Sequence, residues 1–173
     1  MHQDCVPYPR RALYLLLTVP MIGLYIAIAA YMWTFRIAFF AVYIASFVLV
    51  AILQSYVCVV WECPYVGRFA PCAGGFCLPS SQIARLFRNT QRSETTYNIV
   101  VALAFLSLIA FVLTPVYPLY RLGLLYLLAY VGVAIVYALC FLAFVCPVCA
   151  TRHVCPGGQA AAKLRGSIRR QDS

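Results

Sequence analysis

Charged residues are scarce in this 173-residue chain, and acidic residues are the scarcest of all. Only 10% of the residues are charged and only four are acidic, whereas 65% are hydrophobic. Soluble domains carry about 25% charged and about 45–50% apolar residues, so this composition excludes an ordinary soluble domain. The composition instead indicates a membrane protein.

The missing side chains also exclude several kinds of membrane function. His2 and His153 are the only histidines and neither lies in a long apolar run, which excludes a haem held by two histidines inside the membrane. No apolar run contains a lysine for a retinal-type Schiff base or a carboxylate for a proton or cation relay, which argues against an ion-coupled transporter. The sequence also has no P-loop, HExxH or GxSxG motif.

Four apolar runs account for the high hydrophobic content. Each has at least 20 residues, which is enough for a helix to cross the ~30 Å hydrocarbon layer. None contains an acidic or basic residue in its interior. The sequence therefore predicts four transmembrane helices at about Ala12–Trp33, Ile37–Trp61, Thr96–Val116 and Leu122–Cys146.

The positions of the basic residues predict the orientation. Eleven of the thirteen lysines and arginines lie before the first run, between the second and third, or after the fourth. Only Arg36 and Arg121 lie in the other two connections. Because cytoplasmic loops carry the excess of lysine and arginine, we expect a multi-pass protein of the cell membrane with both termini in the cytoplasm.

These features together predict an all-α integral membrane protein, a four-transmembrane-helix up-down bundle with a Cys-rich cytoplasmic cap. The membrane domain covers residues 1–156 and includes a cytoplasmic loop at 62–95, and residues 157–173 form a basic, flexible tail. Two prolines predict a turn at Pro115–Pro118 between the third and fourth helices. After Pro79, a short basic amphipathic helix is expected to run to about Thr90, lying on lipid headgroups or packed on the cap.

Six cysteines follow the second and fourth apolar runs and form two clusters, Cys63, Cys72 and Cys77 in one, and Cys146, Cys149 and Cys155 in the other. The predicted topology brings both clusters to the same membrane surface. Cys58 lies one helical turn inside the membrane below them, and Cys5 lies on the same side. Cys140 lies deeper, in the fourth helix, where it is expected to be a small packing residue.

Metal binding gives two interpretations of the six clustered cysteines. The run Cys146-x2-Cys149-x5-Cys155-Pro156 partly matches ferredoxin spacing, and a cysteine of the first cluster would complete an iron–sulfur site. Alternatively, a structural zinc ion would be held by the CPxC turn together with Cys72 and Cys77, or with His153 in place of one thiolate. The iron–sulfur site would tie the two helical hairpins together at the membrane edge, whereas zinc would order a loop rich in glycine and proline.

Thiol–disulfide exchange is the third interpretation, because Cys146 and Cys149 have the CxxC spacing that lowers the pKa of one thiol. The plan is similar in outline to the vitamin K epoxide reductase and DsbB families, four-helix membrane proteins in which one cysteine pair passes electrons to another beside a quinone. The resemblance covers the helix number and the two cysteine groups on one side. It departs from those reductases in that CxxC ends the last helix here.

The leading expectation is a membrane electron-transfer protein or subunit with a cytoplasm-facing, cysteine-ligated metal site. An iron–sulfur cluster is preferred, with zinc as the alternative cofactor. Gln54, one turn before Cys58, could donate a hydrogen bond to a quinone carbonyl. The expected partners are the lipid bilayer and a redox protein or subunit, and no nucleic acid is expected. Cys146 and Cys149 are catalytic only if the protein is a thiol oxidoreductase, and the three interpretations of the cysteines remain open.

Overall fold

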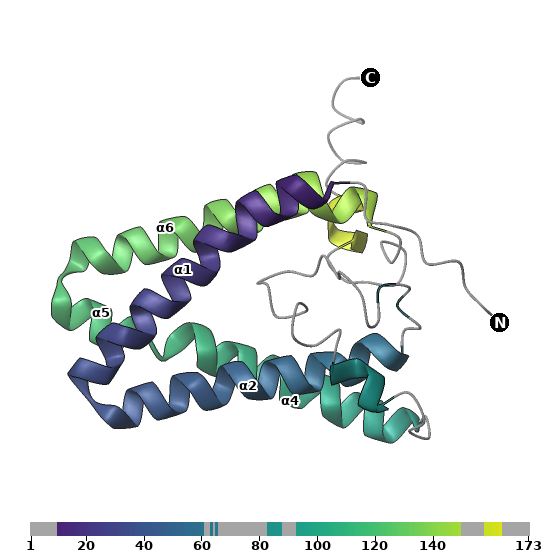
Figure 1. Cartoon of the computed structure of the whole chain (residues 1–173), viewed down its shortest axis with the longest axis horizontal. Coiled ribbons are helices and arrows are strands. Elements are labelled where there is room, and N and C mark those ends of the chain that lie inside the picture. The colour runs from purple at the N-terminus through teal and green to yellow at the C-terminus, as the bar shows by residue number, and fades with distance from the viewer. Residues whose placement is uncertain are drawn as a thin grey trace.

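The fold is described by a computed structural model that covers residues 10–60, 63, 65, 83–87, 93–149 and 158–163 (Figure 1). All regular elements in these ranges are helical, and the ranges contain no strand. The main α-helices are α1 (Arg11–Phe35), α2 (Ile37–Val60), α4 (Glu94–Leu113), α5 (Val116–Leu122) and α6 (Leu124–Cys140). Three short elements accompany them, namely the 3₁₀-helices η2 (Ala84–Phe87) and η4 (Cys146–Val148) and the π-helix η3 (Phe141–Val145).

The prediction of four membrane-spanning helices is confirmed. Four helical segments are long and apolar enough to cross a membrane, namely Arg11–Phe35, Ile37–Val60, Glu94–Leu122 and Leu124–Val148. Their outward surfaces carry large apolar side chains such as Leu16 and Leu125, which are 71% and 76% exposed. So much exposed apolar surface is unfavourable in water but is suited to contact with lipid tails. The chain is therefore a multi-pass helical membrane protein.

The turn between the third and fourth spans lies later than the sequence analysis predicts. The helix is interrupted at Thr114–Pro115, but it resumes as α5 and continues to Leu122. Pro115 and Pro118 fit at the start of α5, where the first backbone N–H groups have no helical acceptor. The chain turns instead at Gly123, whose φ of 150° is readily adopted only by glycine. The predicted turn at Pro115–Pro118 was wrong for this reason.

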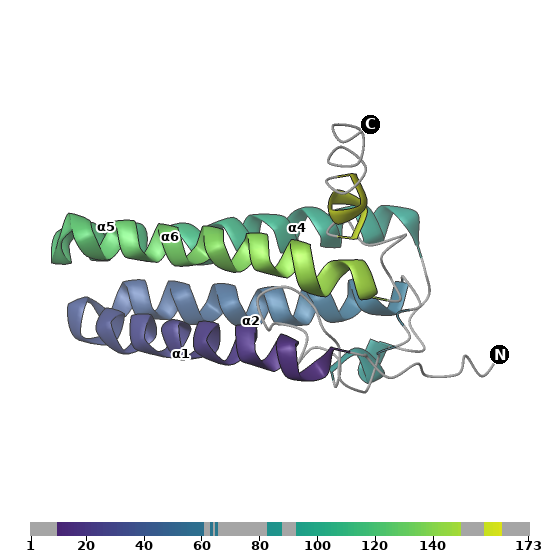
Figure 2. The same ribbon diagram turned by 90° about the horizontal axis from the view of Figure 1, so that it is seen from above.

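The helices pack as neighbours in space. α2 lies beside α4, and α1 packs against both α2 and α6 (Figures 1 and 2). The α1–α2 and α5–α6 connections lie at one end of the molecule, which we call the turn end (Figure 1). The start of α1, the end of α2 and the end of the fourth span lie at the opposite end. A buried core toward the turn end contains Met32, Tyr43 and Phe111, with the last two rings stacked 4.5 Å apart.

Two short segments outside the spans are also described. Residues 84–87 form one 3₁₀ turn that packs against α2, and the Phe87 ring meets Tyr56 edge-on at 6.1 Å. The predicted helix running to about Thr90 otherwise lies outside the described residues. Residues 158–163, which lie within the predicted tail, are helical and bury Ala161.

Candidate functional site

Four cysteines from two distant parts of the chain pack into one apolar cluster at the end opposite the turn end. Cys58 lies near the end of α2, Cys63 follows it, and Cys146 and Cys149 end the fourth span. We call the whole apolar cluster that contains these four side chains the thiol cluster, and the end of the molecule that carries it the thiol end. Tyr14 from the first turns of α1 and Ala161 from the short helix after the fourth span pack into the same cluster.

The predicted site residues are therefore only partly brought together by the described structure. Cys63, Cys146 and Cys149 belong to one apolar cluster, but within the described residues they do not form a group close enough to share a metal ion. Cys72, Cys77 and Cys155 lie outside the described residues. Cys140 is half-buried in α6 and is not a member of the cluster. The five cysteines within the described ranges form no disulfide with one another in this structure.

Cys58 and Cys63 are linked through both backbone and side chain. The backbone N–H of Cys63 donates to the carbonyl of Cys58 at 3.0 Å, a five-residue hydrogen-bond spacing of the π type that follows the last turn of α2. The thiol of Cys58 donates to the sulfur of Cys63, and the backbone N–H of Tyr65 donates to the same sulfur. One sulfur thus accepts two hydrogen bonds.

These hydrogen bonds favour the thiolate of Cys63. The hydrogen bond from Cys58 is the largest effect; burial opposes it, and the bond from Tyr65 assists it. Together they lower the pKa of Cys63 from its ordinary value of 9.0 to about 7. The hydrogen bonds therefore make the nucleophilic thiolate more accessible at neutral pH in Cys63 than in an ordinary cysteine.

The CxxC segment is positioned by a change of helix type. After α6 the chain forms the π-helix η3, and the N–H of Cys146 donates to the carbonyl of Phe141 five residues earlier. In a regular α-helix, residues five apart point about 140° away from each other. The wider π turn aligns them, so Phe141 and Cys146 are both buried in the thiol cluster. The N–H of Cys149 then donates to the carbonyl of Cys146 at 3.3 Å.

The start of α1 fixes the end of the fourth span. The guanidinium of Arg10 donates to the carbonyl of Phe144 at 3.0 Å, which supplies a cation to the carbonyl end of a helix. The ring of Tyr14 meets Phe141 edge-on at 6.0 Å between centroids. These contacts hold the segment that carries Cys146 and Cys149 against α1.

Burial divides the thiol cluster into inner and outer members. Cys58 and Cys146 are 4% and 8% exposed, whereas Cys63 and Cys149 are half-buried. Each of the two segments therefore contributes one inner and one outer thiol. In thiol exchange an accessible thiolate attacks first and a second thiol displaces it, so this arrangement suits exchange at both segments.

A metal centre is not formed by the described residues alone. Among them, no three histidine, cysteine or acidic side chains are grouped closely enough to hold a metal ion. The predicted iron–sulfur or zinc site would need ligands from Cys72, Cys77 or Cys155. The metal interpretation therefore stays a prediction.

Gln54, the predicted quinone contact, is half-buried on α2, one turn before Cys58. It lines neither of the two grooves described next.

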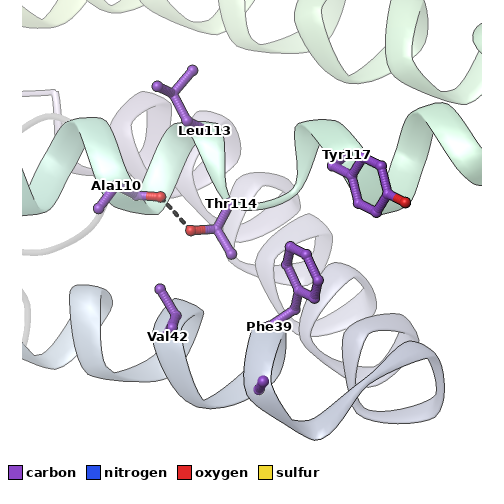
Figure 3. A pocket seen from close by; sticks show the side chains of 7 residues that line it. Phe39, Val42, Ala110, Leu113, Thr114 and Tyr117 are labelled. Atoms are coloured by element: carbon purple, nitrogen blue, oxygen red, sulfur yellow. Dashed lines mark hydrogen bonds between the residues drawn. The ribbon is translucent and has the colours of Figure 1, made fainter.

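Two apolar grooves lie toward the turn end. A groove of about 380 Å³ is lined by α2 and by the region around the α4–α5 junction (Figure 3). The hydroxyl of Thr114 in this groove donates to the carbonyl of Ala110, which leaves an almost wholly apolar lining. A second groove, of about 290 Å³, lies between α1, α5 and α6. These grooves are suited to lipid chains and are remote from the thiol cluster.

Cys58, predicted to lie one turn inside the membrane, belongs to the thiol cluster although it is not among the predicted site residues. The CxxxxC spacing from Cys58 to Cys63 was the available signal, because a turn that ends a helix can bring such residues together. Tyr14 and Ala161, which pack into the same cluster, were not predicted as site residues either.

Compared with known proteins, the chain matches no family, no curated protein and no solved structure.

Proposed function

We propose that this chain is a membrane thiol–disulfide oxidoreductase of the cell membrane, an up-down four-helix bundle with its cysteine-rich cap in the cytoplasm. The orientation is supported by the arginines, since Arg10 and Arg11 precede or begin α1 at the thiol end. Arg36 and Arg121 lie beside the two turns at the turn end. Positive charge is enriched on the cytoplasmic side of membrane proteins, which favours the cytoplasm for the thiol end and both termini.

The observation that carries this proposal is the packing of four cysteines from two distant segments into one apolar cluster. Two segments that each contribute an inner and an outer thiol can form two disulfide-forming pairs. Cysteines that served only as small apolar residues would need neither the two hydrogen bonds to Cys63 nor the CxxC spacing.

The proposed reaction oxidises a dithiol of a redox partner protein and reduces a membrane quinone. A substrate thiolate attacks Cys149 of a Cys146–Cys149 disulfide, which breaks the S–S bond and leaves Cys146 as a thiolate. The second substrate thiol displaces Cys149, so the substrate leaves as a disulfide and the CxxC becomes a dithiol. Two electrons and two protons then pass from the dithiol to the quinone, which becomes a hydroquinone and regenerates the disulfide. Gln54 is proposed to donate a hydrogen bond to a quinone carbonyl.

A cysteine-ligated electron-transfer centre is the second candidate. The observation that favours it is the backbone N–H of Tyr65 directed at the Cys63 sulfur, because such hydrogen bonds also stabilise thiolate ligands of metals. The proposed ligand set is the one predicted from sequence: Cys63, Cys72, Cys77, Cys146, Cys149 and Cys155. An iron–sulfur cluster would make this set an electron carrier, whereas zinc would make it a structural brace.

The test is to purify the protein anaerobically in mild detergent and measure metal, sulfide and turnover in one preparation. Turnover is followed as oxidation of a fluorescent peptide with two cysteines, with a short-chain quinone as the electron acceptor. Thiol chemistry predicts metal-free protein whose turnover requires Cys146 and Cys149. Iron with sulfide and absorbance that bleaches on reduction, in protein that does not oxidise the peptide, would overturn it in favour of electron transfer. Stoichiometric zinc without turnover would favour a structural brace.

A further inference from the structure

The hydrogen bonds around Cys63 create an asymmetry between two neighbouring thiols. Cys63 is half-buried and accepts hydrogen bonds from Cys58 and from the N–H of Tyr65. Cys58 is 4% exposed and lies behind Cys63, toward the core of the thiol cluster. The backbone hydrogen bond between the two residues, 3.0 Å long, fixes their spacing. A half-exposed sulfur held beside a second, protected thiol has the geometry of a nucleophile and its resolving partner.

We propose that Cys63 and Cys58 form a second redox pair, in which Cys63 attacks a disulfide substrate and Cys58 resolves the resulting mixed disulfide. This proposal rests on the proposed function, but it concerns a different pair from Cys146–Cys149. The substrate class is a disulfide presented at the thiol end, from a protein or a small thiol compound.

The two steps balance without a further reactant. With glutathione disulfide as the probe, the Cys63 thiolate attacks one sulfur, forming a Cys63–glutathione bond and releasing one glutathione thiolate. Cys58 loses its proton and attacks the Cys63 sulfur, which forms the Cys58–Cys63 disulfide and releases the second glutathione. Counted from the dithiol, the pair loses two electrons and two protons, one of them when Cys63 ionises, and the two released glutathione thiolates take up two protons.

A purely structural role for Cys58 makes a different prediction. If Cys58 only filled space, its replacement by a residue of similar size would leave the products at Cys63 unchanged. If Cys58 resolves the mixed disulfide, any replacement without a thiol would stop the reaction after its first step. Cys58→Ser is the decisive variant, because serine is close to cysteine in size and retains a hydrogen-bond donor for Cys63.

The experiment treats the full-length protein in mild detergent with glutathione disulfide and then alkylates the remaining thiols. Trypsin cleavage after Arg36 and Arg68 yields one peptide with both Cys58 and Cys63. Cleavage after Arg121 and Arg152 yields another with Cys140 and both cysteines of the CxxC. Mass spectrometry of the first peptide distinguishes an internal disulfide from a glutathione adduct on Cys63.

The wild-type protein is expected to yield the internal Cys58–Cys63 disulfide, and Cys58→Ser is expected to accumulate the Cys63–glutathione adduct at least about tenfold. Cys140→Ser, which removes a thiol outside the cluster, is expected to match wild type. Equal adduct in wild type and Cys58→Ser, or no reaction at Cys63, would overturn the proposal. The CxxC peptide reports the proposed function separately, because that function fails if Cys146 and Cys149 never oxidise, whatever happens at Cys63.

Discussion

The two ends of the helical bundle are built from the same spans but in different ways. At the turn end, single residues such as Arg36 and Gly123 separate consecutive helices, and aromatic rings pack against one another across them. The rings of Phe39 and Tyr117 stack there with centroids 5.8 Å apart. At the thiol end, the second and fourth spans finish in π-type and 3₁₀ turns around the thiol cluster.

Reactive groups in this fold are placed at the irregular helix ends. A tight connection between two helices leaves little backbone hydrogen-bonding capacity unused, because the chain enters the next helix at once. An irregular helix end presents N–H groups in new directions, and beyond the end of α2 the N–H of Tyr65 donates to the sulfur of Cys63. The turn end therefore acts as a structural brace, and the thiol end carries the proposed chemistry. The predictions below test this division.

Loss of the CxxC thiols should have the largest effect. Cys146→Ser or Cys149→Ser is expected to lower oxidation of the dicysteine peptide by about 1,000-fold or more, because each removes a sulfur that forms a covalent bond in the reaction. The measurement is the initial rate of peptide oxidation with a short-chain quinone. Thr114→Val at the turn end is the control and should retain nearly full activity, and equal losses in both regions would contradict the division.

Removing the central ring of the turn-end core should have the largest effect on stability. Phe111 is 2% exposed and stacks on Tyr43, so Phe111→Ala removes packing contacts and leaves a cavity. We expect a loss of about 2 kcal/mol or more, measured as the free energy of unfolding in detergent. The matched control is Leu125→Ala on the exposed surface, where the change should stay below about 0.5 kcal/mol. A similar loss in both variants would mean that this core does not brace the helices.

Two glycines test the turn end more finely. Gly123 has a φ of 150°, so Gly123→Ala strains the backbone and should cost about 1–2 kcal/mol in unfolding free energy. Gly132→Ala is the matched control, because a Cβ there has no neighbour within 4 Å and alanine favours a helix. Thermal unfolding of the two variants in detergent should therefore shift in opposite directions. A stabilising Gly123→Ala would contradict the assigned turn.

The smallest expected effect is the pH dependence of alkylation at Cys63. A pKa lowered to about 7 means that thiolate appears as pH rises through 7 instead of through 9. At pH 7 the thiolate fraction is then about 50-fold greater than in a thiol with a pKa of 9. Because the less basic thiolate is a weaker nucleophile, the labelling rate at pH 7 should rise by only about sixfold. The measurement is the rate of iodoacetamide labelling at Cys63 between about pH 5 and about pH 9. The rate should reach half its maximum near pH 7.

Substitutions at Cys58 sharpen this last test. Cys58→Ala removes the hydrogen-bond donor, so the midpoint should move to higher pH and labelling at pH 7 should slow by up to about sixfold. Cys58→Ser keeps a donor and should leave the midpoint near 7. If both variants behave alike, the hydrogen bond from Cys58 is not what lowers the pKa of Cys63.

The membrane spans were predictable from the sequence because the thickness of the bilayer fixes the length of an apolar helix. The turn at Gly123 was not, because a proline at the start of a helix and a proline that ends one look the same in sequence. The position of Cys63, Cys146 and Cys149 at the same end of the bundle was predictable from the order of the spans. The inclusion of Cys58 in the thiol cluster was not predictable, because its pairing with Cys63 depends on how the chain leaves α2. The π-helix η3 could not be predicted either, because a change of helix type does not alter the hydropathy of the fourth span.

The π-helix η3 has a consequence for how this fold can change. A π turn holds one residue more than an α turn, so it behaves as a single-residue insertion that shifts the helical phase of everything after it. The lipid-facing and core-facing positions of α6 can therefore be selected for membrane packing, while the orientation of Cys146 is adjusted independently. Deleting one residue within η3 would restore the α phase and turn that sulfur away from Tyr14 without altering any residue of α6.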